Sequence, residues 1–318
     1  MWYNDFVAVK PYVSSIREFF MDSKPHTAEK IGLVMEGGSM RGMFTCGVID
    51  VFMEHNLTFD GAVGVSAGAT FGCNIKSRQI GRALRYNKRF CNDPRYAGFR
   101  SLFTTGDLFN VDFCYRTLPF KLDIWDSDTF AANPMEFYVA ASDVETGHPV
   151  YYRCGKGLEE DIEWFRASAS MPLLSHIVEI NDRLLLDGGI TDSIPLKFME
   201  RIGYTRNVVI LTQPEDYVKK KNPLMPLARL EYGRYPNFVR AMANRHIRYN
   251  DTLRYIEERE AAGDVIVVRP PEDLDIGKME RDPDELERVY QVGRDTAGSL
   301  VGRMISEGFC RKYTEPSA

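Results

Sequence analysis

The chain has 318 residues, 44% of them hydrophobic and 27% charged, with a formal net charge of −5. This composition is that of an ordinary globular protein and excludes disordered and fibrous proteins. The isoelectric point near 5.7 disfavours nucleic acid as a partner. Six cysteines occur singly, so we expect reduced thiols and no common zinc site. The sequence has neither a signal-peptide pattern nor an apolar run near the roughly 20 residues that span a bilayer, so we expect a cytoplasmic protein.

The chain divides into three expected parts. Residues 1–29 are a polar N-terminal extension with a short amphipathic helix predicted over 14–21. Residues 30–212 form the core, and residues 213–318 form a C-terminal part that we expect to pack on it. The core begins with the apolar run 30–35, which predicts a buried parallel strand.

A glycine-rich turn, Glu-Gly-Gly-Ser-Met-Arg-Gly over residues 36–42, follows this strand and precedes a helical apolar pattern. Backbone N–H groups at such a turn can hold negative charge. The turn therefore predicts either a phosphate or dinucleotide site or an oxyanion hole for acyl transfer. The dinucleotide fingerprint G-x-G-x-x-G is not matched cleanly, and a turn without function remains an alternative.

A second strand-turn-helix unit contains the candidate nucleophile. The predicted strand 59–65 leads into Gly-Val-Ser-Ala-Gly over residues 64–68, and a helix is expected from 67 to about 85. Small flanking residues let the backbone bend sharply while the Ser66 hydroxyl projects from the corner. Alone, this pentapeptide could equally be a tight loop. A right-handed crossover places both turns at the same sheet edge, where they face one crevice.

The aromatic-rich segment 86–130 predicts an irregular, partly helical cap that lines an apolar pocket, although ordinary core aromatics are an equal alternative. Strands are then predicted over 135–142, 149–153, 175–180, 183–186, 207–212 and 264–269, with helices over 161–169, from 192 onward and over 282–298. The strand 183–186 runs directly into Asp187, which stands at a strand end before two glycines.

Residues 218–255 carry nine lysines and arginines against two acids. Such a segment can contact an anionic membrane surface or gather an anionic substrate. A solvated helical face explains the same pattern, and we favour that interpretation slightly.

A serine nucleophile needs a positioned base. His148 and His176 are the histidines best placed for a catalytic triad, although both are more consistent with surface or hydrogen-bonding roles. Asp187 could instead accept the Ser66 proton directly if both strand ends open into one crevice. Burial would raise the pKa of Asp187, whereas nearby backbone donors would lower it.

Four motifs in this order resemble the patatin-like phospholipases: residues 36–42, 64–68, 167–172 (Ala-Ser-Ala-Ser-Met-Pro) and 187–189 (Asp-Gly-Gly). The resemblance covers roughly residues 30–212, which makes that part a patatin-like catalytic core, and the C-terminal part is similar to that of bacterial members. Four linked motifs are far more specific than any one of them.

The resemblance implies an α/β fold, a three-layer α/β/α sandwich with a mainly parallel central sheet. It makes Ser66 the nucleophile and Asp187 the base of a Ser-Asp dyad, without metal or cofactor. It assigns the oxyanion hole to Gly37, Gly38, Ser39 and Met40. The remaining motif positions are Arg41, Gly42, Gly64, Gly68, Gly188 and Gly189. Ser39 departs from the family's usual glycine, and a positive φ there would cost on the order of 1 kcal/mol.

We therefore expect a lipid acyl hydrolase of the phospholipase or lysophospholipase type. Two alternatives stay open: a serine esterase with a Ser-His-Asp triad, and a non-catalytic module that binds an anionic headgroup or nucleotide. The expected partners are a lipid or small ester substrate and, through transient contact that would place the cytoplasmic protein peripherally at the membrane, an anionic membrane surface. The sequence does not specify acyl chain length, headgroup or oligomeric state.

Overall fold

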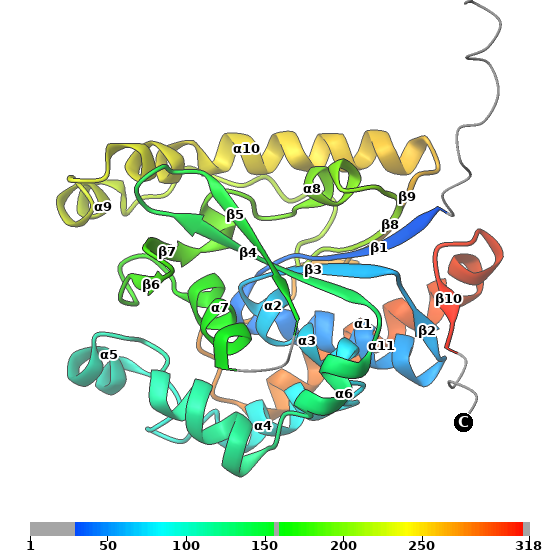
Figure 1. The fold of residues 1–318 in the computed structure, drawn as a ribbon, viewed down its shortest axis with the longest axis horizontal. Coiled ribbons are helices and arrows are strands. Elements are labelled where there is room, and N and C mark those ends of the chain that lie inside the picture. The colour runs from blue at the N-terminus through cyan, green and yellow to red at the C-terminus, as the bar shows by residue number, and fades with distance from the viewer. Residues whose placement is uncertain (1–28, 156–158, 314–318) are drawn as a thin grey trace, which may run out of the picture.

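The fold is organised around one large sheet (Figure 1). The computed structural model describes residues 29–155 and 159–313, so the helix predicted over 14–21 lies outside the described residues. Within these ranges the main sheet has eight strands in the order β6-β7-β4-β3-β1-β8-β9, with β5 paired to β4. These strands are β1 (Lys30–Met35), β3 (Gly61–Val65), β4 (Glu136–Asp143), β5 (Pro149–Cys154), β6 (Val178–Ile180), β7 (Arg183–Asp187), β8 (Tyr204–Ile210) and β9 (Val265–Val268).

The centre of the sheet is parallel, and its β4 side is antiparallel. Strand β1 pairs in parallel with β3 and β8, β3 with β4, and β8 with β9. Strands β5 and β7 both run antiparallel to β4, and β6 runs antiparallel to β7. Every residue of β3 is buried, which explains its continuous run of apolar and small residues. A separate antiparallel pair joins β2 (Leu57–Thr58) to β10 (Arg311–Lys312).

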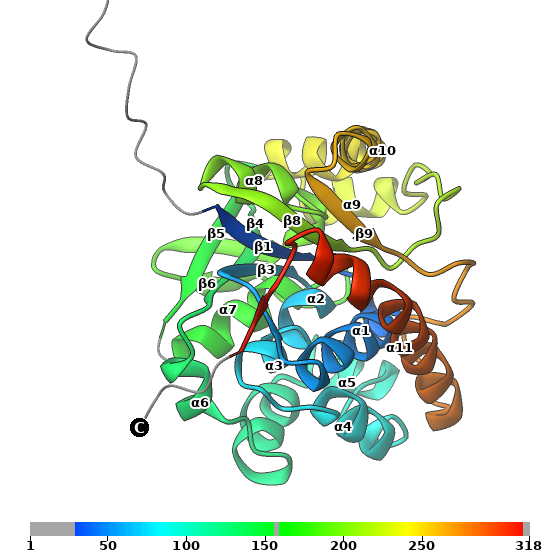
Figure 2. The same cartoon turned by 90° about the vertical axis from the view of Figure 1, so that its right-hand side faces the viewer.

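Helices cover both faces of the sheet, and alternate strand residues face opposite layers (Figures 1 and 2). Leu33 and Met35 belong to the core under α1, α7 and α11, whereas Val34 belongs to the core under α8 and α10. The helices are α1 (Gly42–Glu54), α2 (Ala67–Thr70), α3 (Cys73–Lys76), α4 (Arg82–Phe90), α5 (Phe99–Thr105), α6 (Ser127–Ala132), α7 (Glu159–Ala169), α8 (Leu196–Arg201), α9 (Met225–Glu231), α10 (Pro236–Ala261) and α11 (Pro283–Ser306). The predicted three-layer α/β/α fold with a mainly parallel sheet is confirmed.

Three helix predictions were wrong in their bounds, and one of them is α11, which extends to Ser306 instead of ending at residue 298. The helix expected from residue 67 to about 85 is broken into α2, α3 and α4, and α3 is separated from α4 because Arg78 and Gly81 adopt left-handed conformations with φ of 56° and 72°. Helix α8 begins at Leu196 rather than at residue 192. The Asp192 side chain accepts a hydrogen bond from Tyr151, and Ser193 donates to the Gly189 carbonyl, so neither side chain caps α8. Within the described ranges, no helix combines the length and apolar character needed to cross a bilayer.

Candidate active site

Ser66 occupies a sharp turn between β3 and α2. Its backbone has φ of 53° and ψ of −121°, a conformation that costs about 1–3 kcal/mol for a residue with a side chain. The flanking glycines are required by close packing. A Cβ atom at Gly64 would lie 2.3 Å from the Gly68 carbonyl oxygen, and one at Gly68 would lie 2.3 Å from the Met35 carbonyl oxygen. The turn therefore holds the half-buried Ser66 side chain at the end of the strand.

The Ser66 hydroxyl donates a hydrogen bond of 2.7 Å to Asp187 Oδ2. Asp187 ends β7, which pairs with β4 through Ala141, and β4 in turn pairs with β3. The sheet order thus brings together two residues that are 121 positions apart. The Gly189 N–H donates to the second carboxylate oxygen at 2.8 Å, which fixes the plane of the buried carboxylate. The pair has the geometry of a nucleophile and its general base.

The environment of Asp187 favours proton uptake. Burial raises the pKa of this carboxyl above its ordinary value. The hydrogen bond from Ser66, the positive charge of Arg245 and the Gly189 N–H oppose that rise. A carboxylate with a raised pKa is a stronger base than an exposed aspartate.

The glycine-rich turn lies against Ser66. A Cβ atom at Gly37 would lie 2.9 Å from Ser66 Cβ, so the two backbones can approach only because Gly37 has no side chain. Residues Ser39–Arg41 form one turn of 3-10 helix. Within the described residues, the N–H groups of Gly38, Ser39 and Met40 have no hydrogen-bond acceptor. These free donors beside the serine have the character of an oxyanion hole.

Ser39 has φ of 52°, so this position of the turn does require a left-handed backbone. Its hydroxyl donates a 2.7 Å hydrogen bond to the Lys278 carbonyl oxygen, which offsets part of the strain. A glycine at this position, as is usual in the patatin-like phospholipases that the sequence resembles, would remove both the backbone strain and the hydrogen bond to Lys278. The turn thus keeps its conformation despite the substitution.

The other predicted motif residues surround this centre. Arg41 is half-buried at the end of the 3-10 turn, and Gly42 is the first residue of α1. Gly188 and Gly189 form a 3-10 turn with Ile190 directly after Asp187. A Cβ atom at Gly188 would lie 2.2 Å from the Ala140 carbonyl oxygen of β4, so this glycine is also required by close packing.

Two buried serines hold Ser66 and Asp187 in place, and the sequence alone assigned neither a role. The Ser66 N–H donates to Ser168 Oγ at 2.8 Å, and Ser168 donates to the Ala140 carbonyl oxygen at 2.6 Å. Ser142 donates to the Asp187 carbonyl oxygen at 2.7 Å. The signal for Ser168 was its place in the motif 167–172, but the motif alone does not say which serine faces the turn.

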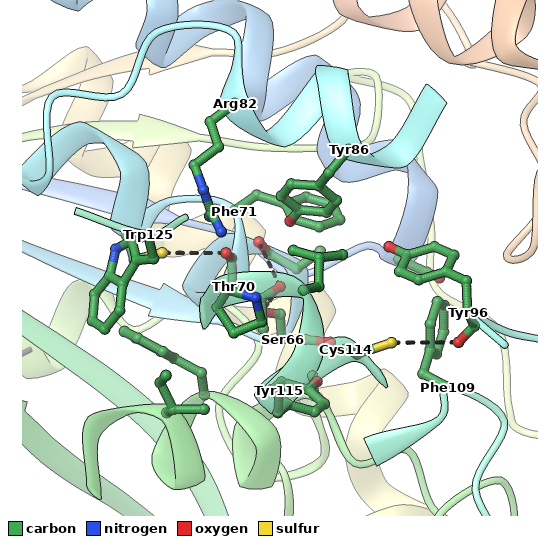
Figure 3. Close-up of a pocket in the computed structure, with 18 of the residues that line it drawn as sticks. Ser66, Thr70, Phe71, Arg82, Tyr86, Tyr96, Phe109, Cys114, Tyr115 and Trp125 are labelled. Carbon is green, nitrogen blue, oxygen red and sulfur yellow. Dashed lines mark hydrogen bonds between the residues drawn. The ribbon is translucent and has the colours of Figure 1, made fainter. Parts of the chain in front are cut away.

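An apolar cavity of about 120 Å³ opens beside Ser66 (Figure 3). By the same measure one water needs about 10–15 Å³, so the cavity has room for several carbon atoms. Figure 3 shows the aromatic side chains around it, which include Phe71, Tyr86, Tyr96, Phe109, Tyr115 and Trp125. All of these residues except Phe71 come from segment 86–130. That segment consists of short helices from α4 to α6 and the π-helix Phe113–Leu122, so the prediction of an irregular cap that lines an apolar pocket is confirmed.

The histidines of the alternative triad lie elsewhere. His176 is largely exposed and its ring contacts Asp107 at 3.1 Å. His148 lies in the turn between β4 and β5, where its N–H donates to Thr146 Oγ1. In the described part of the chain, neither histidine forms a hydrogen bond with Ser66. The geometry gives a histidine triad no support.

A model of the patatin-like phospholipase family matches residues 33–199, more than half of the chain. The chain therefore belongs to the patatin-like phospholipase family. Residues 235–304 match a second model, described as a domain of unknown function, DUF6363. Membership of the family supports lipid acyl hydrolysis at family level.

Several relatives align along most of the chain. The uncharacterized protein YjjU of Escherichia coli (strain K12) is 28% identical over 298 residues, 89% of this chain and 81% of its own length. Lysophospholipase nte1 of Aspergillus terreus is 24% identical over 87% of this chain and 18% of its own length. Lysophospholipase NTE1 of Candida albicans is 25% identical over 88% of this chain and 20% of its own length. The chain thus spans about a fifth of these two lysophospholipases. Among solved structures, VipD from Legionella pneumophila matches 86% of this chain and 67% of its own, with 12% identity and a TM-score of 0.43.

Proposed function

We propose that the protein hydrolyses carboxylic ester bonds of lipids, of the phospholipase or lysophospholipase type, through an acyl intermediate on Ser66. One observation carries this proposal. The 2.7 Å hydrogen bond from the Ser66 hydroxyl to Asp187 lies at the edge of an apolar cavity. A nucleophile with its base supplies the chemistry, and the cavity supplies a place for an acyl chain.

In the first half of the reaction, Ser66 Oγ attacks the ester carbonyl carbon while its proton passes to Asp187. The N–H groups of the glycine-rich turn stabilise the negative oxygen of the tetrahedral intermediate. The intermediate collapses when the bond from carbon to the alcohol oxygen breaks. The alcohol leaves with the proton that Asp187 held.

In the second half, Asp187 takes a proton from water as the water oxygen attacks the acyl carbon. Collapse of the second intermediate breaks the bond to Ser66 Oγ, and Asp187 returns the proton to the serine. The products are a fatty acid and the restored enzyme. The Ser168 and Ser142 hydrogen bonds hold the nucleophile and base in register through both halves.

The test is turnover of p-nitrophenyl butyrate by the wild type and by Ser66→Ala. We expect the variant to stay folded and to lose at least about a thousandfold in kcat/KM, because the covalent route is removed. His176→Ala and His148→Ala serve as controls. Both should keep full activity in an enzyme with a Ser-Asp dyad, whereas an enzyme with a histidine triad would lose activity in one of them. Full activity of Ser66→Ala, or loss of activity in a histidine variant alone, would contradict the proposed dyad.

We also propose that one end of the molecule contacts a lipid surface. Phe103 of α5 and Leu230 of α9 are 86% and 82% exposed, and the two helices lie at the same end in Figure 1. The exposed Arg229 precedes Leu230 in the chain and the exposed Arg234 follows four residues later, against one exposed acid, Glu231, so apolar side chains and net positive charge occur together. That combination suits an anionic membrane surface.

Sedimentation with phosphatidylglycerol vesicles tests this contact. We expect Phe103→Glu and Leu230→Glu to weaken binding by about tenfold each, since burial of one such side chain contributes about 1.5–3 kcal/mol. Ile305→Glu, an exposed apolar position of α11, is the matched control. Equal binding by all three variants would exclude this end as the contact.

A further inference from the structure

Four cationic side chains lie close enough to one another or to Asp187 to interact through their charges: the half-buried Arg41, Lys219 and Arg245 and the exposed Lys278, here called the cationic cluster. Arg245 of α10 donates a hydrogen bond to the Gly189 carbonyl oxygen. The segment that contains Lys278 is tied to the turn by the hydrogen bond from Ser39. None of the four side chains is part of the lining of the apolar cavity. Ser66 therefore has an apolar side and a cationic side.

Two members of the cluster, Lys219 and Arg245, are positioned by contacts of α10 and of the segment after β8. The Lys219 N–H donates to Asn250 Oδ1 at 2.9 Å, and Asn250 donates back to the Lys219 carbonyl oxygen at 3.1 Å. The Lys219 ammonium lies 4.2 Å from the centre of the Tyr249 ring. Tyr249 donates to Glu36 Oε1 at 2.6 Å, and Arg245 lies one helical turn before Tyr249 on the same face of α10.

The positive charges of the cluster are not balanced by ion pairs. Within residues 29–155 and 159–313, none of its four side chains forms a salt bridge, whereas the buried Arg82 pairs with Asp123 and the half-buried Arg269 pairs with Glu260. The Nε of Arg41 is buried without a partner in the same ranges. Burying a charged N–H group without a hydrogen-bond partner costs free energy unless an anion binds to it.

The two nearby carboxylates are already engaged. Glu36 accepts hydrogen bonds from Tyr249 and from the Thr212 N–H, the latter at 2.7 Å. Asp187 accepts from Ser66 and Gly189. Burial and the positive charges of Arg245, Arg41 and Lys278 lower the pKa of Lys219 to about 8, while Glu36 opposes that shift. Four cations against two carboxylates leave an excess positive charge beside the nucleophile.

We propose that the cationic cluster binds a phosphate monoester on the alcohol part of the ester substrate, so that the preferred substrate is a monoacyl lipid with a phosphate close to the ester. This inference rests on the proposed function. The acyl and alcohol parts leave the ester carbonyl in different directions, so an acyl chain in the apolar cavity directs the alcohol toward the cationic side. A phosphate monoester carries about −1.5 to −2 charges at pH 7, which suits the excess charge of the cluster.

The test compares three palmitoyl esters with one acyl chain: lysophosphatidic acid, lysophosphatidylcholine and monopalmitoylglycerol. We expect kcat/KM to fall in that order, with about a tenfold or greater preference for the phosphate monoester over the neutral ester. Lys219→Gln and Arg245→Gln should each lower this preference by about tenfold, the lower end of the factor expected for one charge-assisted hydrogen bond. Lys220→Gln, the exposed neighbour, should keep it.

Two results separate this inference from the proposed function. Hydrolysis of all three esters at equal kcat/KM would overturn the anion site and leave the hydrolase intact. If no ester is hydrolysed by the folded protein, the proposed function fails, and the site is then tested by calorimetry of glycerol 3-phosphate with the Ser66→Ala variant. We expect binding that Lys219→Gln weakens by about tenfold or more, whereas equal affinity with and without Lys219→Gln would overturn the site.

Discussion

The two sides of Ser66 are built from different parts of the chain. The apolar cavity is lined by residues between Ser39 and Met171, all inside the range matched by the patatin-like family model. Three members of the cationic cluster, Lys219, Arg245 and Lys278, come from the region after that range. In the proposed mechanism, the family core supplies the nucleophile, the base and the acyl side, and the C-terminal region supplies positive charge on the alcohol side. We therefore expect changes in the C-terminal region to alter substrate preference without altering the reaction centre.

Neutral and anionic esters should react at the same centre beside Ser66, and Asp187→Asn removes the proposed base of that centre. We expect kcat to fall by about 10²–10⁴-fold for neutral and anionic esters alike, because asparagine cannot accept the serine proton. The amide keeps nearly the same shape and can still accept from the Gly189 N–H. Circular dichroism and thermal unfolding check that the variant is folded, and a loss confined to anionic esters would show that Asp187 acts through charge alone.

The apolar side is tested by Ala169→Leu, which places a larger side chain in the cavity lining. We expect kcat/KM for p-nitrophenyl laurate to fall by about tenfold or more relative to the butyrate, since a few displaced methylene groups are worth 1–3 kcal/mol. The control is Ala132→Leu, the same change at an exposed position of α6. An unchanged ratio of laurate to butyrate in Ala169→Leu would place the acyl chain elsewhere.

The cationic side predicts a difference in pH dependence. A lysine is charged below its pKa, so with a pKa of about 8 Lys219 loses its charge as the pH rises from 7 to 9. A phosphate monoester is already dianionic over this range, because its second pKa is about 6. We therefore expect kcat/KM for lysophosphatidic acid to fall by up to about tenfold across it, while kcat/KM for monopalmitoylglycerol stays level.

Lys219→Gln supplies the check on that profile. Without the titrating ammonium, the two esters should show the same dependence between pH 7 and 9. A fall that persists in Lys219→Gln would assign the titration to another group.

The sequence predicted the strands and turns of the site correctly where the local residue pattern agrees with the fold. Buried runs that end in glycines predicted β1 and β3, and two consecutive strand-turn-helix units predicted that Ser66 and the glycine-rich turn meet. The carboxylate at the end of β7 was predicted in the same way, and the structure places Asp187 within 2.7 Å of the serine hydroxyl.

Other features depend on tertiary contacts that residue types do not specify. The left-handed backbone at Arg78 breaks a helix that the apolar pattern predicted to be continuous. The basic composition of segment 218–255 is evident from the sequence, but nothing in it shows that Lys219 lies over the Tyr249 ring and Arg245 contacts Gly189 while Lys220 is exposed. That arrangement depends on contacts such as Tyr249 with Glu36, which are 213 residues apart.

The central claim is that Ser66 is an activated nucleophile, and a fluorophosphonate probe tests it most directly, since only an activated serine reacts rapidly with it. We predict a single covalent adduct, located at Ser66 by mass spectrometry of the digested protein, with labelling slowed strongly in Asp187→Asn. Absence of an adduct in the folded wild type, or an adduct on a different serine, would contradict the account.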